Sequence, residues 1–214
     1  MESDKKRIRK VGIMGGTFDP VHLGHLRVAE MVRLRFDIEK VIFVPAYCPP
    51  HKQIKDITSA EHRYAMVSAA ITGNSRFEAS RIEIGCNCPT YAGDTIRAFK
   101  EMYRKDSEIF FITGLDAILT IITWDKSKTY PGLCQFIAAT RPGYQKEAIE
   151  KRIPHDFRPY VTIIEEPALS ISSTEIRDRI KTNKPIDKMV TKAVMDYINT
   201  WGLYSRNRQT EEFL

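Results

Sequence analysis

The stretch Gly15-Gly-Thr-Phe-Asp-Pro-Val-His-Leu-Gly-His25 decides the fold of this 214-residue chain, because it joins an apolar run to a helical one. Residues 11–14 before it have the length and character of a buried strand, and residues 22–36 read as a helix. Gly15 and Gly16 let the backbone turn sharply and approach a ligand without a Cβ in the way. A glycine-rich turn that runs into a helix predicts a phosphate site at the N-terminus of that helix.

Two histidines stand in the same stretch. His22 and His25 are three residues apart, so on a helix they share one face. Two imidazoles beside a phosphate donate hydrogen bonds to its oxygens and spread negative charge. The Gly-x-Gly-x-x-Gly fingerprint of dinucleotide sites is absent here. Two alternatives stay open: half of a zinc site, although a third and fourth ligand at suitable spacing are missing, and a pair of surface histidines.

Strand-length apolar runs recur along the chain with helical stretches between them. The capping-box spacing of Thr58 and Glu61 predicts the start of the second helix. Alternating strands and helices imply right-handed crossovers and a Rossmann-like, doubly wound parallel sheet of the α/β class. The predicted strands are residues 11–14, 41–44, 77–84, 109–113, 136–140 and 161–165, and the predicted helices are 22–36, 59–72, 91–103 and 115–122.

A second helix start, Ile171-Ser-Ser-Thr-Glu-Ile-Arg177, follows the last predicted strand. Ser172 with Glu175 has capping-box spacing, so Ser172 is the predicted N-cap. Ser173 and Thr174 then present amides and hydroxyls at the positive helix end, and Arg177 adds a guanidinium on the same face. Taken alone, the segment also fits a merely well-capped helix. Beside the first motif, it predicts a polyphosphate held between two helix starts.

The end of the chain departs from the alternation of strands and helices. Two helices follow Ser172 without a strand between them; the second carries an apolar stripe from Met189 to Trp201, and Gly202 is its predicted stop. We therefore expect a single domain over residues 1–204, with an α/β body at about 10–170, a C-terminal helical part at about 171–204 and a polar tail at 205–214.

The composition of the chain limits the partners and metal sites that we expect. The chain is 43% hydrophobic and 28% charged, with a net charge of +6. A basic N-terminal tail and a phosphate pocket explain this charge as well as DNA does, so we expect no nucleic-acid partner. A run of about 20 apolar residues and the apolar centre of a signal peptide are both missing, which predicts a cytoplasmic protein without a membrane partner. We expect structural or incidental thiols at Cys48, Cys86, Cys88 and Cys134 and no metal held by the protein.

Together the two helix starts resemble the nucleotidyltransferase superfamily with His-x-Gly-His and Ser-Ser-Thr-x-x-Arg signatures. From about Lys10 to Tyr204 the chain is similar to the bacterial nicotinate-nucleotide adenylyltransferase family. It departs from the family at Ala92, where threonine is common, and at Cys48, where asparagine is frequent. The supporting segments are Pro49-Pro-His-Lys52, His62-Arg63, Thr90-Tyr-Ala-Gly-Asp-Thr95, Gly114-Leu-Asp116, Trp124 and Arg141-Pro-Gly143.

This resemblance implies a reaction between ATP and nicotinate mononucleotide that gives deamido-NAD and pyrophosphate. The mononucleotide phosphate attacks the α-phosphorus of ATP directly, without a general base or covalent intermediate, and pyrophosphate leaves with Mg²⁺. By resemblance His22, His25, Ser173 and Arg177 contact the phosphates. The implied ATP site also contains Gly15, Gly16, Thr17, Phe18, Gly24, Gly114, Asp116, Ser172 and Thr174.

The resemblance implies a separate set of residues for the mononucleotide. The pyridine ring stacks on Trp124, and backbone amides near Ala92 and Asp125 hold its carboxylate. Lys52 is a phosphate contact or a solvated loop lysine, and Asp116 binds a ribose hydroxyl or caps a helix. The full set is Lys52, Thr90, Tyr91, Ala92, Trp124, Asp125 and Arg141.

Two rival functions and the oligomeric state stay open. The first rival is another nucleotidyltransferase on the same scaffold, such as the phosphopantetheine enzyme, although such enzymes lack segments like those at Trp124 and Arg141. The second is a nucleotide-sensing or nucleic-acid-binding module on a retired enzyme fold. A homo-oligomer is compatible with the sequence.

Overall fold

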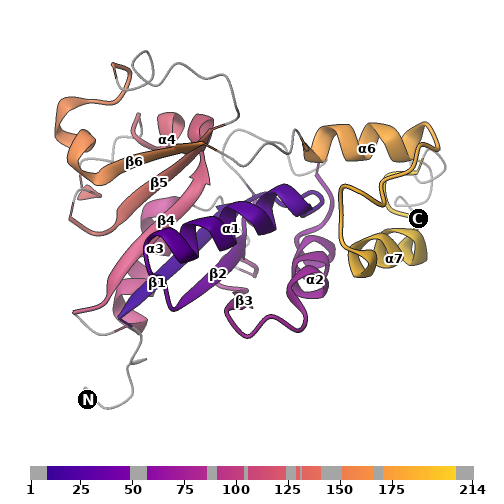
Figure 1. The fold of residues 1–214 in the computed structure, drawn as a ribbon, viewed down its shortest axis with the longest axis horizontal. Helices are drawn as coiled ribbons and strands as arrows, with labels where there is room; N and C mark the ends of the chain where they lie inside the picture. The colour runs from indigo at the N-terminus through magenta and orange to yellow at the C-terminus, as the bar shows by residue number, and fades with distance from the viewer. Residues whose placement is uncertain are drawn as a thin grey trace.

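The computed structural model describes residues 9–48, 57–85, 91–103, 106–123, 129–130, 132–140, 151–165 and 171–205. Within these residues six parallel strands form one sheet in the order β3-β2-β1-β4-β5-β6, with helices on both faces (Figure 1). This order confirms the predicted doubly wound sheet. The strands are β1 (Lys10–Gly16), β2 (Lys40–Pro45), β3 (Phe77–Ala79), β4 (Glu108–Gly114), β5 (Gln135–Thr140) and β6 (Val161–Glu165).

The sheet separates two apolar cores. Side chains alternate across it, so Ile13 of β1 faces one core while Met14 faces the other. The first core lies under α1 (Leu23–Arg35) and α2 (Ala60–Ile71), and the second lies under α3 (Ala92–Met102) and α4 (Leu115–Ile121). Burial on both faces explains why the strands read as continuous apolar runs in the sequence.

Two local predictions were wrong. The strand expected at 77–84 ends at Ala79, because the Ile84 N–H turns back to donate to the Arg81 carbonyl at 2.8 Å. The N-cap of α2 is Ser59 and not Thr58; the Ser59 hydroxyl accepts the His62 N–H at 3.4 Å. Thr58 stays in the preceding loop, where its own N–H is bound to the Asp19 carboxylate at 3.2 Å.

The C-terminal helices pack on the first core. After β5, a 3-10 helix η3 (His155–Tyr160) leads into β6, and the chain then continues to α6 (Ser173–Lys181) and α7 (Lys192–Trp201). Val194 and Ile198 of α7 are buried in that core, and Figure 1 shows α7 next to α2. Gly202 ends α7 in the left-handed conformation with φ of +58°, as predicted. The predicted apolar stripe is wrong at Trp201, which is 47% exposed.

Two composition-based predictions concern thiols and membranes. Cys48 and Cys134 are buried thiols outside any disulfide, and burial raises the pKa of Cys134 far above its usual value, so that thiol is inert. Cys86 and Cys88 lie outside the described residues. None of the helices in the described part of the chain combines the length and apolar character that a membrane span requires.

Candidate active site

The site begins at the point where the strand order reverses. β1 pairs with β2 on one side and with β4 on the other, so the connections that leave these strands diverge to opposite faces. A crevice forms at such a switch point, outside the carboxyl ends of the strands, and ligands of open α/β sheets bind there. Thr17, Phe18, Asp19 and Pro20, named here the 17–20 loop, leave β1 at this point and lead to α1.

The sharp turn of this loop is made by Phe18 and not by the glycines, which corrects the sequence prediction. Gly15 and Gly16 are the last residues of β1, and neither has a positive φ. They are glycines because a Cβ on Gly15 would lie 2.8 Å from the Phe111 ring, and one on Gly16 would lie 3.0 Å from the Phe18 ring. Phe18 has a φ of +53°, a conformation that costs a bulky residue about 1–3 kcal/mol.

The two histidines cap α1 reciprocally. His22 is the N-cap, with extended backbone, and its Nδ1 accepts the His25 N–H at 3.4 Å. His25 is the third helical residue, and its Nδ1 accepts the His22 N–H at 3.2 Å. The rings stack with 3.6 Å between centroids. They face one another because of this reciprocal cap and not, as the spacing suggested, because both are helical.

The cap fixes the protonation of both rings. A neutral imidazole that accepts at Nδ1 carries its proton on Nε2, so His22 and His25 are both Nε2–H donors. Burial lowers the pKa of His25 well below its usual value, and the neighbouring His22 lowers it further. Phe18 packs edge-on to His25 at 5.0 Å. Gly24 leaves room for the pair, since a Cβ there would lie 3.0 Å from His22 Nδ1.

The start of α6 lies against the 17–20 loop. Ser172 caps the helix by accepting the Glu175 N–H at 3.1 Å, as predicted. The Ser173 hydroxyl donates to the Pro20 carbonyl at 2.9 Å, and Arg177 Nη1 donates to the Asp19 carbonyl at 2.7 Å. The tertiary structure therefore brings the two predicted helix starts together, although these hydrogen bonds go to the loop backbone.

Arg177 has donors beyond this contact. Its Nη2 donates to the Thr174 hydroxyl at 3.3 Å. A guanidinium carries five N–H donors, so these two bonds leave capacity for an anion. Thr174 is exposed at the first turn of α6, next to the positive end of the helix. The α6 start is compatible with both holding the loop and meeting a phosphate.

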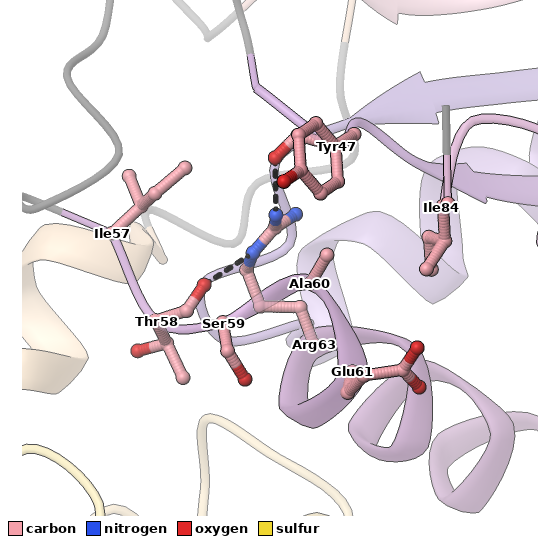
Figure 2. A pocket seen from close by; sticks show the side chains of 9 residues that line it. Tyr47, Ile57, Thr58, Ser59, Ala60, Glu61, Arg63 and Ile84 are labelled. Atoms are coloured by element: carbon pink, nitrogen blue, oxygen red, sulfur yellow. Dashed lines mark hydrogen bonds between the residues drawn. The ribbon is translucent and has the colours of Figure 1, made fainter. Parts of the chain in front are cut away.

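Arg63 of α2 also holds the loop. Its side chain is fully buried and donates to three backbone carbonyls: Thr58 at 2.8 Å, Thr17 at 2.7 Å and Tyr47 at 2.9 Å. Figure 2 shows the guanidinium between Tyr47 and Thr58. Burial lowers the Arg63 pKa, and the nearby charge of Asp19 opposes that shift. The sequence marked Arg63 only as a family match, because two of its three acceptors, the Thr17 and Tyr47 carbonyls, lie 46 and 16 positions away.

Asp19 is a second residue that the sequence did not single out. Its side chain is 4% exposed and accepts two hydrogen bonds, from the Tyr204 hydroxyl to Oδ1 at 2.6 Å and from the Thr58 N–H to Oδ2 at 3.2 Å. Burial, followed by the charge of Asp19, raises the pKa of Tyr204 far above its usual value. The partners are 185 positions apart, so no local pattern in the sequence could have joined them.

A cavity of about 320 Å³ opens beside Arg63 (Figure 2). Tyr47 and Ile84 lie on either side of it, and the first turn of α2, with Ala60 and Glu61, forms another wall. It lies just beyond the carboxyl ends of β2 and β3. Two residues of its wall come shortly before predicted mononucleotide contacts. Tyr47 precedes the segment that contains Lys52, and Gly85 precedes the segment that contains Thr90.

Of the other predicted site residues, some lie within the described residues and some do not. Gly114 ends β4 and is the N-cap of α4, so the alternative that Asp116 caps this helix was wrong; Asp116 is exposed in its first turn. Tyr91 is the N-cap of α3 and is 39% exposed, and Ala92 is its first residue, where an N–H has no acceptor within the helix. Lying outside the described residues are Lys52, Thr90, Trp124, Asp125 and Arg141.

Comparison with known proteins agrees with this geometry. The profile of the cytidylyltransferase-like family matches residues 13–179. A probable nicotinate-nucleotide adenylyltransferase of Moorella thermoacetica is 48% identical over 91% of each chain, and one of Thermoanaerobacter sp. is 42% identical over 95% of this chain and 98% of its own. A solved structure, the Plasmodium falciparum nicotinic acid mononucleotide adenylyltransferase complexed with NaAD, is 25% identical with a TM-score of 0.74; the match covers 92% of this chain and 97% of that one.

Proposed function

Because the chain belongs to the cytidylyltransferase-like family and, within it, to the nicotinate-nucleotide adenylyltransferases, we propose that it transfers the adenylyl group of ATP to nicotinate mononucleotide. The products are deamido-NAD and pyrophosphate, so the reaction is a step of NAD biosynthesis. The observation that carries the proposal is the stacked pair of Nε2–H donors, His22 and His25, at the point where the strand order reverses.

The residues support a direct displacement. An oxygen of the mononucleotide phosphate forms a bond to the α-phosphorus of ATP, while the bond from that phosphorus to the bridging oxygen breaks. The nucleophile is already an anion, so no base has to remove a proton. The protein contributes positioning and stabilisation of the charge on the oxygens in flight.

The two helix starts divide this work in the proposal. His22 and His25 donate from Nε2 to non-bridging phosphate oxygens, and they do so as neutral rings because each Nδ1 accepts a backbone N–H. Arg177 supplies a permanent positive charge, and the first turn of α6 supplies amides at Ser173 and Thr174. We assign Gly15, Gly16, Thr17 and Phe18, at the end of β1 and in the loop after it, to the floor on which the substrates meet. We assign Gly114 and Asp116, at the end of the neighbouring β4 and the start of α4, to the ribose.

Magnesium fits this site as an ion carried by the substrate. Among the described residues there is no group of three histidine, cysteine or carboxylate side chains that could enclose a metal. Mg²⁺ is commonly bound through substrate phosphates and a few carboxylates or waters. When bound, it neutralises negative charge on the departing pyrophosphate; Ser173, Arg177 and the histidines would meet the phosphate oxygens that it leaves available.

For the mononucleotide, the proposal uses the cavity beside Arg63. The cavity is bounded by Tyr47 and Gly85, next in sequence to the segments that contain Lys52 and Thr90. The Ala92 amide at the α3 N-terminus is a suitable donor for a nicotinate carboxylate. Tyr91 on the same turn, together with Thr90, Trp124, Asp125 and Arg141, completes the proposed pyridine site.

A substrate panel tests the function. Purified protein with Mg²⁺ is assayed for pyrophosphate release with ATP or CTP and with nicotinate mononucleotide, nicotinamide mononucleotide or phosphopantetheine. We expect the highest kcat/KM for ATP with nicotinate mononucleotide. Release with phosphopantetheine alone, or with CTP in preference to ATP, would contradict the proposal. Equal kcat/KM for the two mononucleotides would contradict the assigned preference for the acid.

A further inference from the structure

The 17–20 loop is held by hydrogen bonds from segments far along the chain. Arg63 of α2 binds the Thr17 carbonyl, and Ser173 and Arg177 of α6 bind the Pro20 and Asp19 carbonyls. The Asp19 side chain is bound by the Thr58 N–H and by the Tyr204 hydroxyl. The loop between β1 and the histidine pair is thus fixed by four side chains and one backbone N–H that themselves lie outside it.

From this arrangement we propose that Tyr204 is a positioning residue for adenylyl transfer, which acts through Asp19 to hold the 17–20 loop in its reactive shape. The proposal rests on the proposed function. Tyr204 follows α7 and contacts the loop through its side-chain hydroxyl. Its effect on the reaction therefore passes through Asp19 to Phe18 and the histidine pair.

Two strained residues support this assignment. Tyr204 has a φ of +65° and Phe18 a φ of +53°, although neither is a glycine. Such conformations persist where the surroundings over-determine them, and they concentrate at functional sites. A glycine or asparagine would adopt the backbone of residue 204 more easily. The tyrosine at this position is explained by what its side chain does at Asp19.

The hydrogen bond between Tyr204 and Asp19 is strong and does not change over the working pH range. A hydroxyl that donates to a buried carboxylate makes a charge-assisted hydrogen bond, here at 2.6 Å. Burial and the adjacent Asp19 raise the pKa of Tyr204, so its hydroxyl keeps the proton throughout the working pH range. The Tyr204 hydroxyl also lies 3.9 Å from Met66 Sδ of α2, a weak contact that is lost with the hydroxyl. The remainder of the side chain packs against the first core, and that packing survives removal of the hydroxyl alone.

The variant Tyr204→Phe removes this hydroxyl, and Tyr197→Phe is its matched control. Tyr197 lies on α7, and its hydroxyl is 3.0 Å from His62 Nδ1 of α2. We expect Tyr204→Phe to lower kcat about tenfold, since a misplacement of reacting groups by about 1 Å can cost about a hundredfold and the shift here should be smaller. The KM values for ATP and nicotinate mononucleotide should stay within about twofold, and Tyr197→Phe should keep the kcat of the parent protein.

A second readout does not depend on catalysis. Hydrogen–deuterium exchange of the ligand-free protein is followed in a peptide spanning residues 16–25. Faster exchange there in Tyr204→Phe, but not in Tyr197→Phe, supports the proposal. Unchanged exchange together with unchanged kcat in Tyr204→Phe overturns it. A parent protein without adenylyltransferase activity contradicts the proposed function, while the exchange comparison still decides whether Tyr204 holds the loop. If Tyr204→Phe folds poorly, Asp19→Asn weakens the same bond from the acceptor side and should give the same two effects.

Discussion

The starts of α1 and α6 lie against the same loop, but their side chains are committed in different ways. At α1 the capping groups are two histidine rings, and the Nδ1 atom of each accepts the backbone N–H of the other residue. At α6 the cap is a serine, and the following Ser173 and Arg177 donate to the loop backbone. The α6 start thus helps to fix the 17–20 loop, which leads into α1. Two helix starts for which the sequence predicts the same phosphate-binding role therefore differ in what their side chains contact.

The largest expected effect comes from removing a donor at α1. We predict that His25→Ala lowers kcat for pyrophosphate release by about 10²–10³-fold, the usual cost of one preorganised donor to a developing charge. The lost cap should lower the free energy of unfolding by only about 1 kcal/mol, so the variant stays folded. Steady-state kinetics and thermal unfolding measure the two effects. His155→Ala, on the exposed η3, is the control; equal kcat in His25→Ala and the control would remove the catalytic role from α1.

A smaller effect is expected at the α6 start. Arg177→Lys keeps the charge but loses the planar fork that binds the Asp19 carbonyl and Thr174 together, so we predict about a tenfold loss of kcat/KM. Arg179→Lys on the same helix is the matched control, because Arg179 donates to the Pro185 carbonyl away from the loop. If both variants had the kinetics of the parent protein, the α6 start would be only a capped helix.

The smallest expected effect is a dependence of the free energy of unfolding on pH. It should arise from the neutral His25 at the α1 start and not from the charged Arg177 at the α6 start. Because the folded-state pKa of His25 lies well below its unfolded value, the unfolded chain binds more protons as pH falls. The free energy of unfolding is therefore highest above about pH 6.5 and decreases below it, by about 1 kcal/mol at pH 6. Urea unfolding at pH 7.5 and pH 6 should show a smaller difference in His25→Gln than in the parent protein. An equal difference would show that His25 titrates normally.

Most of the architecture was predictable because it depends on local patterns. Apolar runs buried on both faces of a parallel sheet stand out in the sequence, and Ser172 with Glu175 marked the α6 N-terminus correctly. One error lies where a distant segment competes, and another where the chain makes a local turn. Thr58 matched a capping-box pattern, but Asp19 binds its N–H, so the cap moved to Ser59. β3 is shorter than its apolar run because the chain turns back at Arg81.

In the candidate site, the sequence indicated the residues that we propose for phosphate binding, because two histidines at one helix start and a serine-capped helix with an arginine have a chemistry of their own. Only the tertiary structure decided how they are held. Phe18 takes the strained turn, Arg63 joins three carbonyls, and Tyr204 reaches Asp19 from 185 positions away. A hydrogen bond between such distant positions leaves no periodic or spaced signal in the sequence, since its partners meet only after the sheet and the C-terminal helices have packed.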